Sequence, residues 1–390
     1  MRILMVLDNE FPPDIRVEKE AKTLINAGHE VSIACLTRQN RTTSEDINQI
    51  RVYRKPISKF IDKSSVGCLK FPFYFNFWRH FIKKLLKQHA FDAIHIHDLP
   101  LAQIGYEMKT RYGIPFVLDL HENWPAFLRA ARHTNTLLGK LLSSYTQWID
   151  YENNMTEQAD AVITVIDEMK YYLKERGRNP NKLFVVPNTV DLDLLPQPVN
   201  EADPSYFTLF YSGGINIHRG IQTVIKGLRL LKDQIPNIRC WIAGSGSYRP
   251  ALEKLVKSYQ LDSNVSFLGQ MSYNQMVHVL FSSDIGLIPH NKTEQRDTTI
   301  PNKLFEYMYA SKPVLSSDVS TVERILSETG AGLTYPYQNH KAFAQKVLYL
   351  YKHPEARKKM GINGKKAVID KYNWKNTAPA LAELYQTLLR

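Results

Sequence analysis

The chain has 390 residues, which is long for one typical domain and enough for two domains with separate cores. Hydrophobic residues make up 44% of it and charged residues 23%, a composition that argues against a disordered protein. The three cysteines, Cys35, Cys68 and Cys240, lie far apart and lack the spacing of metal ligands. We therefore expect a protein of the reducing cytoplasm, with neither a disulfide framework nor a zinc site.

The net charge of +12 predicts attraction to something anionic: nucleic acid, an anionic membrane or phosphorylated small molecules. The charge alone does not choose among these partners. No apolar run is long enough for a transmembrane helix, and the run Ile3–Leu7 is too short for a signal peptide. That run is better interpreted as a first buried strand.

Short β-rich runs alternate with amphipathic helices through the first half of the chain. Apolar positions at helical spacing predict a helix over Arg16–Ala27, which Gly28 would end. We expect strands at Arg2–Leu7, Val31–Cys35, Ala93–Ile96, Pro115–Leu120, Ala161–Val165 and Leu183–Val186.

The same pattern restarts after a polar stretch with two prolines, 197–205, which we interpret as a linker. Strands are then expected at Phe207–Tyr211, Arg239–Ala243, Val265–Leu268, Ile285–Ile288 and Pro313–Ser316. This order predicts parallel sheets covered on both faces. The fold class is thus α/β, with two Rossmann-like doubly wound domains, 1–196 and 206–390, facing a central cleft where ligands bind beyond the strands' carboxyl ends. The last helix could pack back on the first domain.

The segment Lys70–His89 departs from this pattern because it interleaves aromatic residues with Arg79, Lys83, Lys84 and Lys87. A basic, aromatic-rich amphipathic helix can lie in the interface of an anionic membrane. The alternative is an ordinary core helix whose lysines are solvated, and the sequence leaves both open.

A glycine turn marks the first expected phosphate site. Gly213 and Gly214 follow a strand and precede a helix, so backbone amides could approach an anion there. Arg219, at the entrance of that helix, could make a forked contact with a diphosphate. The later turn at Gly244 is at least as consistent with a purely structural role.

The most informative local motif is a loop that leads into a helix carrying Glu306. The loop and the helix start suit a phosphate, and the carboxylate one turn farther suits ribose hydroxyls. Lys303 adds positive charge, although an exposed lysine and a capping carboxylate are the ordinary alternatives. The loop residues placed at the donor site are Thr298, Thr299, Ile300, Pro301 and Asn302.

Polar residues also follow strands in the first half of the chain. His121 and Glu122 lie at a strand end, where His121 could bind a sugar hydroxyl or take part in proton transfer. His97 and Asp98 end another strand and are interpreted as groups that position the loop. The alternating pair His95 and His97 lacks an evident third metal ligand, so no metal is expected.

The loop after the first strand carries Asp14 and Arg16. Arg16 at a helix start could point into the cleft and meet a phosphate or an anionic acceptor. Its ordinary role would be a salt bridge with Asp14 or Glu18.

Together these motifs resemble the GT-B glycosyltransferases, and within them the retaining family 4. The likeness covers nearly the whole chain. Its markers are PPDIRVEKEAKTLINAGHEV, the pair His97 and Asp98, His121, the run Val186–Asp191 that contains Asn188, YSGGINIHRGI, and PNKLFEYMYASKPVLSSD.

The resemblance implies that the C-terminal domain binds a UDP- or GDP-linked sugar and the N-terminal domain binds the acceptor. Glu306 would hold the ribose, Arg219 with the Gly213–Gly214 turn the diphosphate, and His121 the transferred sugar, with Asn188 among the donor-binding residues. No metal or other cofactor is expected, because side chains and amides stabilise the leaving diphosphate. The family retains the anomeric configuration.

The sequence departs from the family at two positions of the donor site. The family commonly has a second Glu eight residues before the ribose-binding one, and here that position is Thr298, beside Asp297. The family's Arg after the glycine of the diphosphate strand is Gly214 here, which leaves Arg219 as the main cation. The loop containing Asp14 and Arg16 resembles a subset acting on bacterial surface polysaccharides, so the expected acceptor is a glycan or a lipid-linked intermediate.

Two other functions remain as alternatives. A non-hydrolysing sugar-nucleotide epimerase shares the architecture. A nucleic-acid-binding protein is suggested only by charge, and since no recognised module supports it we expect no nucleic acid partner. The favoured location is the cytoplasm, with peripheral contact to the inner face of an anionic membrane through Lys70–His89.

Overall fold

The computed structural model describes residues 1–39, 41–130, 137–195 and 203–388. The chain divides into two compact units, one of Met1–Asn188 with Thr377–Arg390 and the other of Thr189–Asn376. The unit boundary thus falls at 188/189, ahead of the expected linker 197–205, most of which lies outside the described residues. The last helix, α17 (Trp374–Leu388), has its C-terminal part in the first unit, where Tyr385 Oη lies 2.9 Å from His95 Nδ1.

The first unit contains an eight-stranded sheet in the order β3-β4-β2-β1-β5-β6-β7-β8, in which only the β3–β4 pair is antiparallel. Its central strands are buried along almost their whole length, because helices cover both faces. The strands are β1 (Arg2–Leu7), β2 (Glu30–Thr37), β3 (Ser44–Ile47), β4 (Ile50–Pro56), β5 (Ala93–His97), β6 (Phe116–Leu120), β7 (Ala161–Thr164) and β8 (Leu183–Val185).

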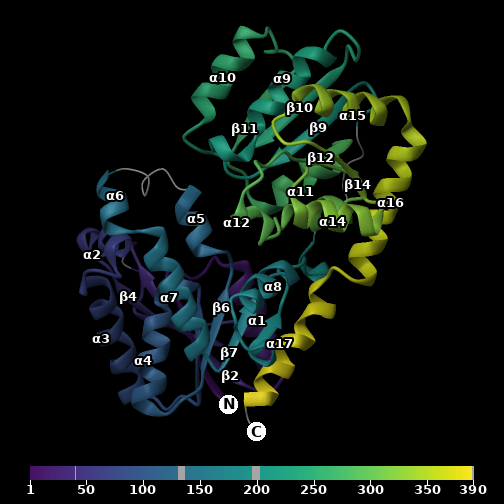
Figure 1. Cartoon of the computed structure of the whole chain (residues 1–390). Coiled ribbons are helices and arrows are strands. Elements are labelled where there is room, and N and C mark those ends of the chain that lie inside the picture. Colours follow the sequence, from purple (N-terminus) through teal and green to yellow (C-terminus); the bar gives the residue numbers. More distant parts are fainter. Residues whose placement is uncertain (40, 131–136, 196–202, 389–390) are drawn as a thin grey trace. The chain divides into compact units, whose positions relative to one another are not determined.

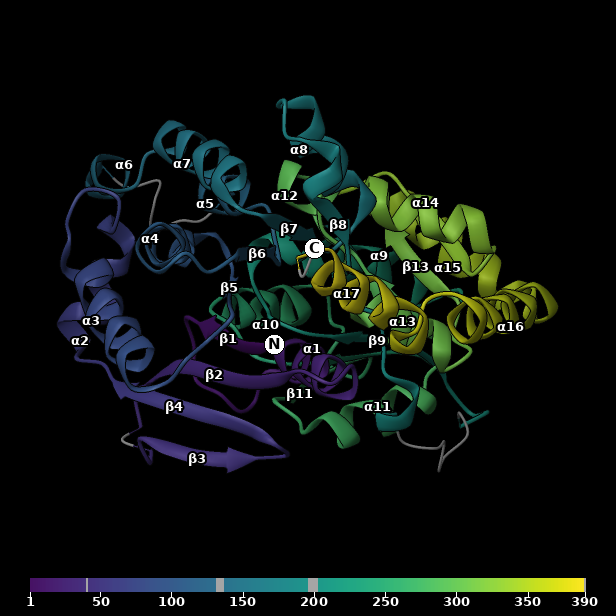
Figure 2. The same ribbon diagram turned by 90° about the horizontal axis from the view of Figure 1, so that it is seen from below.

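Figure 2 shows α3, α4 and α7 on one side of this sheet, and α1 and α17 on the other. The helices are α1 (Ile15–Asn26), α2 (Lys59–Ser64), α3 (Phe73–Gln88), α4 (Ala102–Tyr112), α5 (Trp124–Ala130), α6 (Leu137–Leu142), α7 (Tyr145–Gln158) and α8 (Asp167–Glu175).

The second unit contains a six-stranded parallel sheet in the order β11-β10-β9-β12-β13-β14. Its strands are β9 (Phe207–Ser212), β10 (Ile238–Ala243), β11 (Val265–Gly269), β12 (Ile285–Ile288), β13 (Val314–Ser317) and β14 (Gly332–Tyr335). Its helices, labelled in Figure 1 where room allows, are α9 (Ile221–Leu231), α10 (Arg249–Ser258), α11 (Tyr273–Phe281), α12 (Glu294–Asp297), α13 (Lys303–Tyr309), α14 (Ser320–Thr329), α15 (His340–Lys352) and α16 (Pro354–Asp370).

The prediction of two parallel-sheet α/β domains is confirmed, and every strand expected from the sequence is present. Three strands were not predicted: β3, β4 and β14. β3 and β14 lie at sheet edges and are mostly exposed or half-buried, so they lack the continuous apolar run of a buried strand.

The segment Lys70–His89 forms α3, whose apolar face packs into the first unit. The buried side chains on this face are Tyr74, Phe75, Trp78, Phe81, Ile82 and Leu85. Most of the aromatic residues that made this segment unusual in the sequence therefore belong to the core. Among the described residues, no helix is long and apolar enough to cross a membrane.

Candidate functional site

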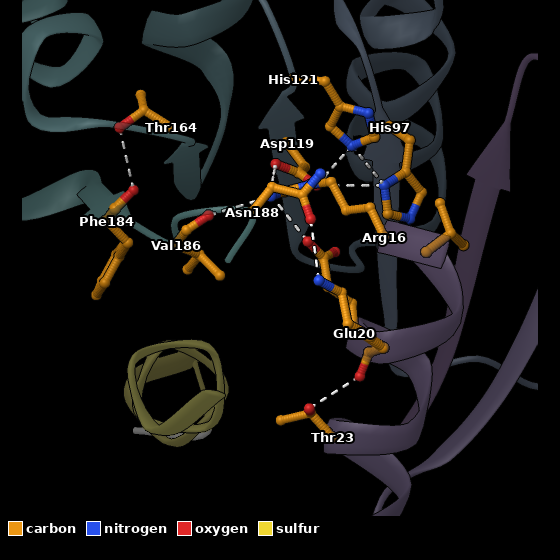
Figure 3. Close-up of polar contacts among 12 residues, drawn as sticks. Arg16, Glu20, Thr23, His97, Asp119, His121, Thr164, Phe184, Val186 and Asn188 are labelled. Atoms are coloured by element: carbon orange, nitrogen blue, oxygen red, sulfur yellow. Dashed lines mark hydrogen bonds and ion pairs between the residues drawn. The ribbon is translucent and has the colours of Figure 1, made fainter. Parts of the chain in front are cut away.

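Polar side chains of the first unit converge where β5 and β6 end and α1 begins (Figure 3). His97 is the last residue of β5, Asp119 lies near the end of β6, and His121 follows that strand. Because β5 and β6 are parallel neighbours with His97 paired to Asp119, their carboxyl ends bring these groups together. Arg16 approaches from the first turn of α1.

Arg16 is buried, and each nitrogen of its guanidinium has a hydrogen-bond partner within the chain. Its Nη2 donates to Asp119 Oδ1 at 2.8 Å and lies 2.9 Å from Glu20 Oε1, one helical turn along α1. Its Nη1 donates to the carbonyl oxygen of Val186 at 3.1 Å. In place of the alternative salt bridge with Asp14 or Glu18, the guanidinium pairs with Glu20 and Asp119.

Asp119 joins this ion pair to two histidines. Its Oδ2 lies 2.9 Å from His121 Nε2 and 3.3 Å from His97 Nδ1, and the two rings are 3.2 Å apart between the same nitrogens. The other nitrogen of His121, Nδ1, lies 3.5 Å from Asp98 Oδ2. His121 therefore lies between two carboxylates, with 19% of its side chain exposed.

The electrostatics of this cluster make His121 a cation and His97 neutral. Burial lowers the pKa of His121, but the carboxylates of Asp98 and Asp119 outweigh it and raise that pKa to about 9. Burial, aided by His95, lowers the pKa of His97 to about 3. A neutral His97 can accept at Nδ1 the proton that His121 Nε2 shares with Asp119.

The two buried carboxylates of the cluster carry different charge. Burial raises the pKa of both, but Arg16 and His121 reverse this for Asp119 and hold its pKa well below the usual value. Burial raises the pKa of Glu20 to about 8, with Arg16 opposing the shift and Asp119 adding to it. At neutral pH the arrangement is an anionic Asp119 between two cations, beside a protonated Glu20.

The cluster also contains a set of atoms that could hold a metal ion. Glu20, His95, His97 and Asp119 each offer one ligand atom, all within 4.8 Å of one another and all buried. The sequence did not reveal the carboxylates that complete this set with the two histidines. Arg16 contacts both of them at 2.8 and 2.9 Å, so a guanidinium already supplies the positive charge that a metal would bring.

The remaining candidates of the first unit contact other residues of that unit. Asp14 is the N-cap of α1 and accepts from the amide of Val17 at 3.1 Å, while Asp98 accepts from the amide of His121 at 3.2 Å. Asn188 Oδ1 accepts from Lys19 Nζ at 3.0 Å, which places Asn188 beside the Arg16 cluster in the first unit. Glu122 is half-buried in the turn after β6.

The second unit gathers cations where β9 and β12 end. Arg219 Nη1 lies 3.4 Å from Nε2 of the buried His290, and Lys303 Nζ donates to the carbonyl of Ser212 and lies 4.2 Å above the ring of Tyr211. Among the described residues, Arg219 Nε is buried without a hydrogen-bond partner. Burial and then the charge of Arg219 lower the pKa of Lys303 well below its usual value. These positive groups would be stabilised by an anion.

Glycines of the second unit are required by close approach. A Cβ at Gly244 would lie 2.0 Å from the carbonyl oxygen of Gly213, and a Cβ at Gly220 would lie 1.6 Å from that of Pro289. A Cβ at Gly213 would lie 2.7 Å from Lys303 Nζ. Close packing of the backbone therefore accounts for glycine at position 244. At position 213, the missing side chain leaves room for the Lys303 ammonium group. Gly214 accepts a hydrogen bond from Tyr211 at 2.8 Å.

Glu306 lies in the first turn of α13, half-buried, near the hydroxyl of Tyr273. The loop before it is held by internal bonds: the hydroxyls of Thr298 and Thr299 each donate to a carbonyl of α12 at 2.9 Å. Asp297 accepts from the amide and hydroxyl of Ser320, so its carboxylate caps α14. Ile300, Pro301 and Asn302 complete the loop, and α13 begins at Lys303.

Sequence reasoning missed several members of both clusters. Glu20 could have been found from its i,i+4 spacing to Arg16 on a helix. His290, just beyond β12, could have been found from the rule that polar residues at strand ends face ligands. Lys19 has no local signal, because its partner is 169 residues away.

Two family models match this chain, one over each half. The model described as Glycosyltransferase Family 4 matches residues 15–194, and the model described as Glycosyl transferases group 1 matches residues 197–367.

Individual proteins agree with these models. An uncharacterized glycosyltransferase of Methanocaldococcus jannaschii, MJ1178, is 25% identical over 309 residues, 78% of either chain. The sucrose-phosphate synthase of Thermosynechococcus elongatus superposes with a TM-score of 0.81 at 19% identity, covering 100% of this chain and 99% of its own. HepE of Anabaena, solved in complex with UDP-glucose, has a TM-score of 0.71 at 14% identity, covering 99% and 100%.

Proposed function

Because the chain is a GT-B glycosyltransferase of the group 1 and family 4 type, we propose that it transfers a hexose from a UDP- or GDP-sugar with retention of configuration. The proposed acceptor is a glycan or lipid-linked intermediate of cell-surface polysaccharide synthesis. The residues proposed to act are the Arg16, Asp119 and His121 cluster of the first unit and the Arg219 and Lys303 cluster of the second.

The observation that carries the proposal is the group of cations in the second unit. Arg219 ends a short 3-10 turn that follows the glycine turn, and Lys303 begins α13, which carries Glu306 three residues farther along. Arg219 and Lys303 would bind the diphosphate and stabilise the charge that develops when the glycosidic bond to it breaks. Glu306 would accept hydrogen bonds from the two ribose hydroxyls.

The first-unit cluster suits the other end of the donor. His121 is a cation whose ring is held by Asp119 and Asp98, and part of it is exposed. His121 Nε2 is already engaged by Asp119. The other ring nitrogen, Nδ1, lies 3.5 Å from Asp98 Oδ2 and would donate its hydrogen to a hydroxyl of the transferred sugar. Arg16 and His97 would position this group through Asp119.

We propose that no metal takes part in the reaction, since Arg219 and Lys303 supply the positive charge that a divalent ion would bring to a diphosphate. The proposed enzyme should therefore work in the presence of a chelator. Loss of transfer with chelator, restored by a divalent ion, would overturn this part of the proposal.

A panel of nucleoside-diphosphate sugars tests the proposed donor. A ligand bound only by the folded state raises the melting temperature, so the true donor should stand out in a thermal-shift screen. The rise in melting temperature should be smaller for Arg219→Ala than for Arg219→Lys. Lysine keeps the positive charge and loses only the bidentate hydrogen bonding of the guanidinium. Equal shifts for Arg219→Ala and the unaltered chain would remove Arg219 from the site.

We further propose that the enzyme acts in the cytoplasm and contacts an anionic membrane. Three exposed aromatic rings support this contact: Phe60 of α2 and Phe71 and Phe73 at the start of α3, exposed by 65%, 47% and 46%. The Phe60 and Phe73 ring centroids are 5.6 Å apart and those of Phe71 and Phe73 are 6.3 Å apart. Exposed lysines lie near these rings in the sequence, at positions 59, 63 and 70, and each would add about 1 kcal/mol near an anionic leaflet.

Vesicle co-sedimentation tests this contact. The protein should bind anionic vesicles more than neutral ones, and less at high salt. Exchanging Phe60 and Phe73 for Ser should weaken binding by removing apolar burial, whereas Lys83, Lys84 and Lys87 changed to Glu should weaken only the electrostatic part. Equal sedimentation of all three proteins would make α3 an ordinary structural helix.

Two alternative functions have no further support. Both matching family models describe glycosyltransferases, which leaves the epimerase without a feature of its own. The nucleic-acid alternative rested on net charge, and the cations of the second unit gather at strand ends where a small anion suits them.

A further inference from the structure

A basic groove lies in the first unit between β4 and α3, apart from the Arg16 cluster. It has a volume of about 710 Å³, within the range of small-molecule sites. Arg51, Tyr53 and Lys55 alternate along β4, so their side chains share one face of the sheet. Successive turns of α3 present His80, Lys84 and Gln88. Phe81 and Leu85 supply apolar surface between the two rows.

The charge of this groove is one-sided. Among the described residues that line it, none is acidic, while Arg51, Arg54, Lys55 and Lys84 are cationic. Asp46 pairs with Arg51 at 2.8 Å, and Glu45 pairs with Arg54 from outside the groove. No ion pair to Lys55 or Lys84 occurs within the described parts of the chain. Two lysines are thus left for an external anion.

Lys55 is the more constrained of these lysines. Its Nζ lies 4.3 Å from the centre of the Phe77 ring and donates to the Phe77 carbonyl at 2.9 Å. Burial, and then the charge of Lys84, lower the pKa of Lys55. The positive charges of Lys55 and Lys84 repel each other in this half-buried groove. One phosphate between the two side chains would stabilise both charges.

Two aromatic rings line the groove near Arg51. Tyr53 and His89 lie 5.2 Å apart between ring centroids, and the Arg51 guanidinium lies 5.6 Å from the centre of the Tyr53 ring. These rings, with Phe81 and Leu85, offer apolar contact to the organic part of a ligand. The groove therefore combines an anion site with an apolar wall.

We propose that this groove binds a phosphorylated molecule with an apolar part, its phosphate between Lys55 and Lys84 and its organic part on Tyr53, Phe81 and Leu85. The site is separate from the donor site, whose cations lie in the second unit. The same chemistry is offered by the head group of an anionic lipid and by a free phosphate ester.

Calorimetric titration of the full chain with two probes tests the proposal. The probes are inorganic phosphate and dihexanoyl phosphatidic acid below its aggregation limit. The double variant Lys55→Met with Lys84→Gln should bind at least about tenfold more weakly, since two charge-assisted hydrogen bonds are lost. Lys84→Gln alone alters an exposed side chain and should show part of this loss without affecting folding.

Two controls separate the groove from other anion sites. Lys87→Gln changes a lysine of the same helix that does not line the groove and should bind like the unaltered chain. Arg219→Ala should keep groove binding while losing nucleotide binding, so failure of the donor assignment is distinguishable from failure of this proposal. Tighter binding of the lipid than of phosphate supports the apolar wall of the proposed site, and equal binding of the two probes contradicts that wall's part in it. No binding of either probe, or equal binding by the Lys55 and Lys84 variants and the unaltered chain, overturns the proposal.

Discussion

Asp119 Oδ2 lies 2.9 Å from His121 Nε2, while Oδ1 of the same carboxylate accepts from Arg16 Nη2 at 2.8 Å. One buried anion is thus shared between two cations, one on a helix and one in the turn after a strand. Because Asp119 is the only described group bonded to both, its removal should alter the ionisation of His121 and the stability of the unit together.

We expect His121 to titrate near pH 9, as its pKa indicates. The proton would be bound more tightly in the folded state than in the unfolded one, whose histidine titrates near 6.5. The stabilisation should therefore be complete below about pH 6.5 and disappear as the pH rises through about 9, a change on the order of 3 kcal/mol. NMR titration of histidine ring carbons, assigned by comparison with His121→Gln, measures this pKa.

The matched control for this titration is Asp119→Asn. It removes one of the two carboxylates that raise the pKa of His121, so the midpoint should move down toward 6.5. An unaltered chain in which His121 titrates near 6.5 would contradict the cationic assignment.

The two carboxylates that contact Arg16 should respond differently to amide substitution. Glu20→Gln resembles the protonated form that Glu20 adopts below about pH 8, so it should change the free energy of unfolding by less than about 1 kcal/mol at pH 6. Asp119→Asn leaves Arg16 and His121 without their shared anion and should cost about 3–5 kcal/mol. Urea unfolding at pH 6 compares them. Equal losses would show that both carboxylates are ionised.

Strands whose side chains are almost all buried could be predicted from the sequence. Strands with only some buried side chains could not. Ile3–Leu7 is a continuous apolar run and Ala161–Val165 is interrupted only by Thr164, and both form strands with a neighbour on each side in the sheet. Along β4 the buried Val52 alternates with the half-buried Arg51 and Tyr53. The charged residues of the strand made this two-residue period hard to recognise in the sequence. For α3 the amphipathic pattern could be recognised in the sequence, but the pattern could not decide whether the apolar face meets the core or a membrane, because either environment favours it.

The site could be predicted residue by residue but not as a set of contacts. His121, Arg219 and Glu306 were singled out because strand ends and helix starts have local sequence signals. The Arg16–Asp119 bond joins residues 103 positions apart, and Lys303 meets the carbonyl of Ser212 across 91 positions. Such pairings depend on sheet order, which no local pattern contains.

Glu306→Ala should weaken nucleoside-diphosphate binding by roughly tenfold to a hundredfold while leaving the fold intact, since two hydrogen bonds to a carboxylate are lost from a half-buried position. Calorimetric titration with the best nucleotide from the thermal-shift panel measures the loss. Glu253→Ala is the control, because Glu253 pairs with Arg249 on the surface of the same unit. Unchanged affinity of Glu306→Ala for every nucleotide would remove Glu306 from the donor site.

Donor binding should also take up a proton at Lys303. Burial and the neighbouring Arg219 lower the pKa of Lys303 in the ligand-free chain. A bound diphosphate would stabilise the ammonium form and raise this pKa. At any pH between the two values, binding must therefore be accompanied by uptake of up to one proton. Titrations in buffers with different ionisation enthalpies measure this uptake as the slope of binding enthalpy against buffer enthalpy.

Two variants identify the group that takes up the proton. Lys303→Met should abolish the uptake and weaken binding. His290 is the other candidate, since burial and the neighbouring cations, Lys303 first among them, also lower its pKa. His290→Gln should leave the uptake in place if Lys303 is the source, and should abolish it if the imidazole is protonated instead. A binding enthalpy that does not depend on the buffer would contradict the assignment of Lys303 as a group that changes its charge when the donor binds.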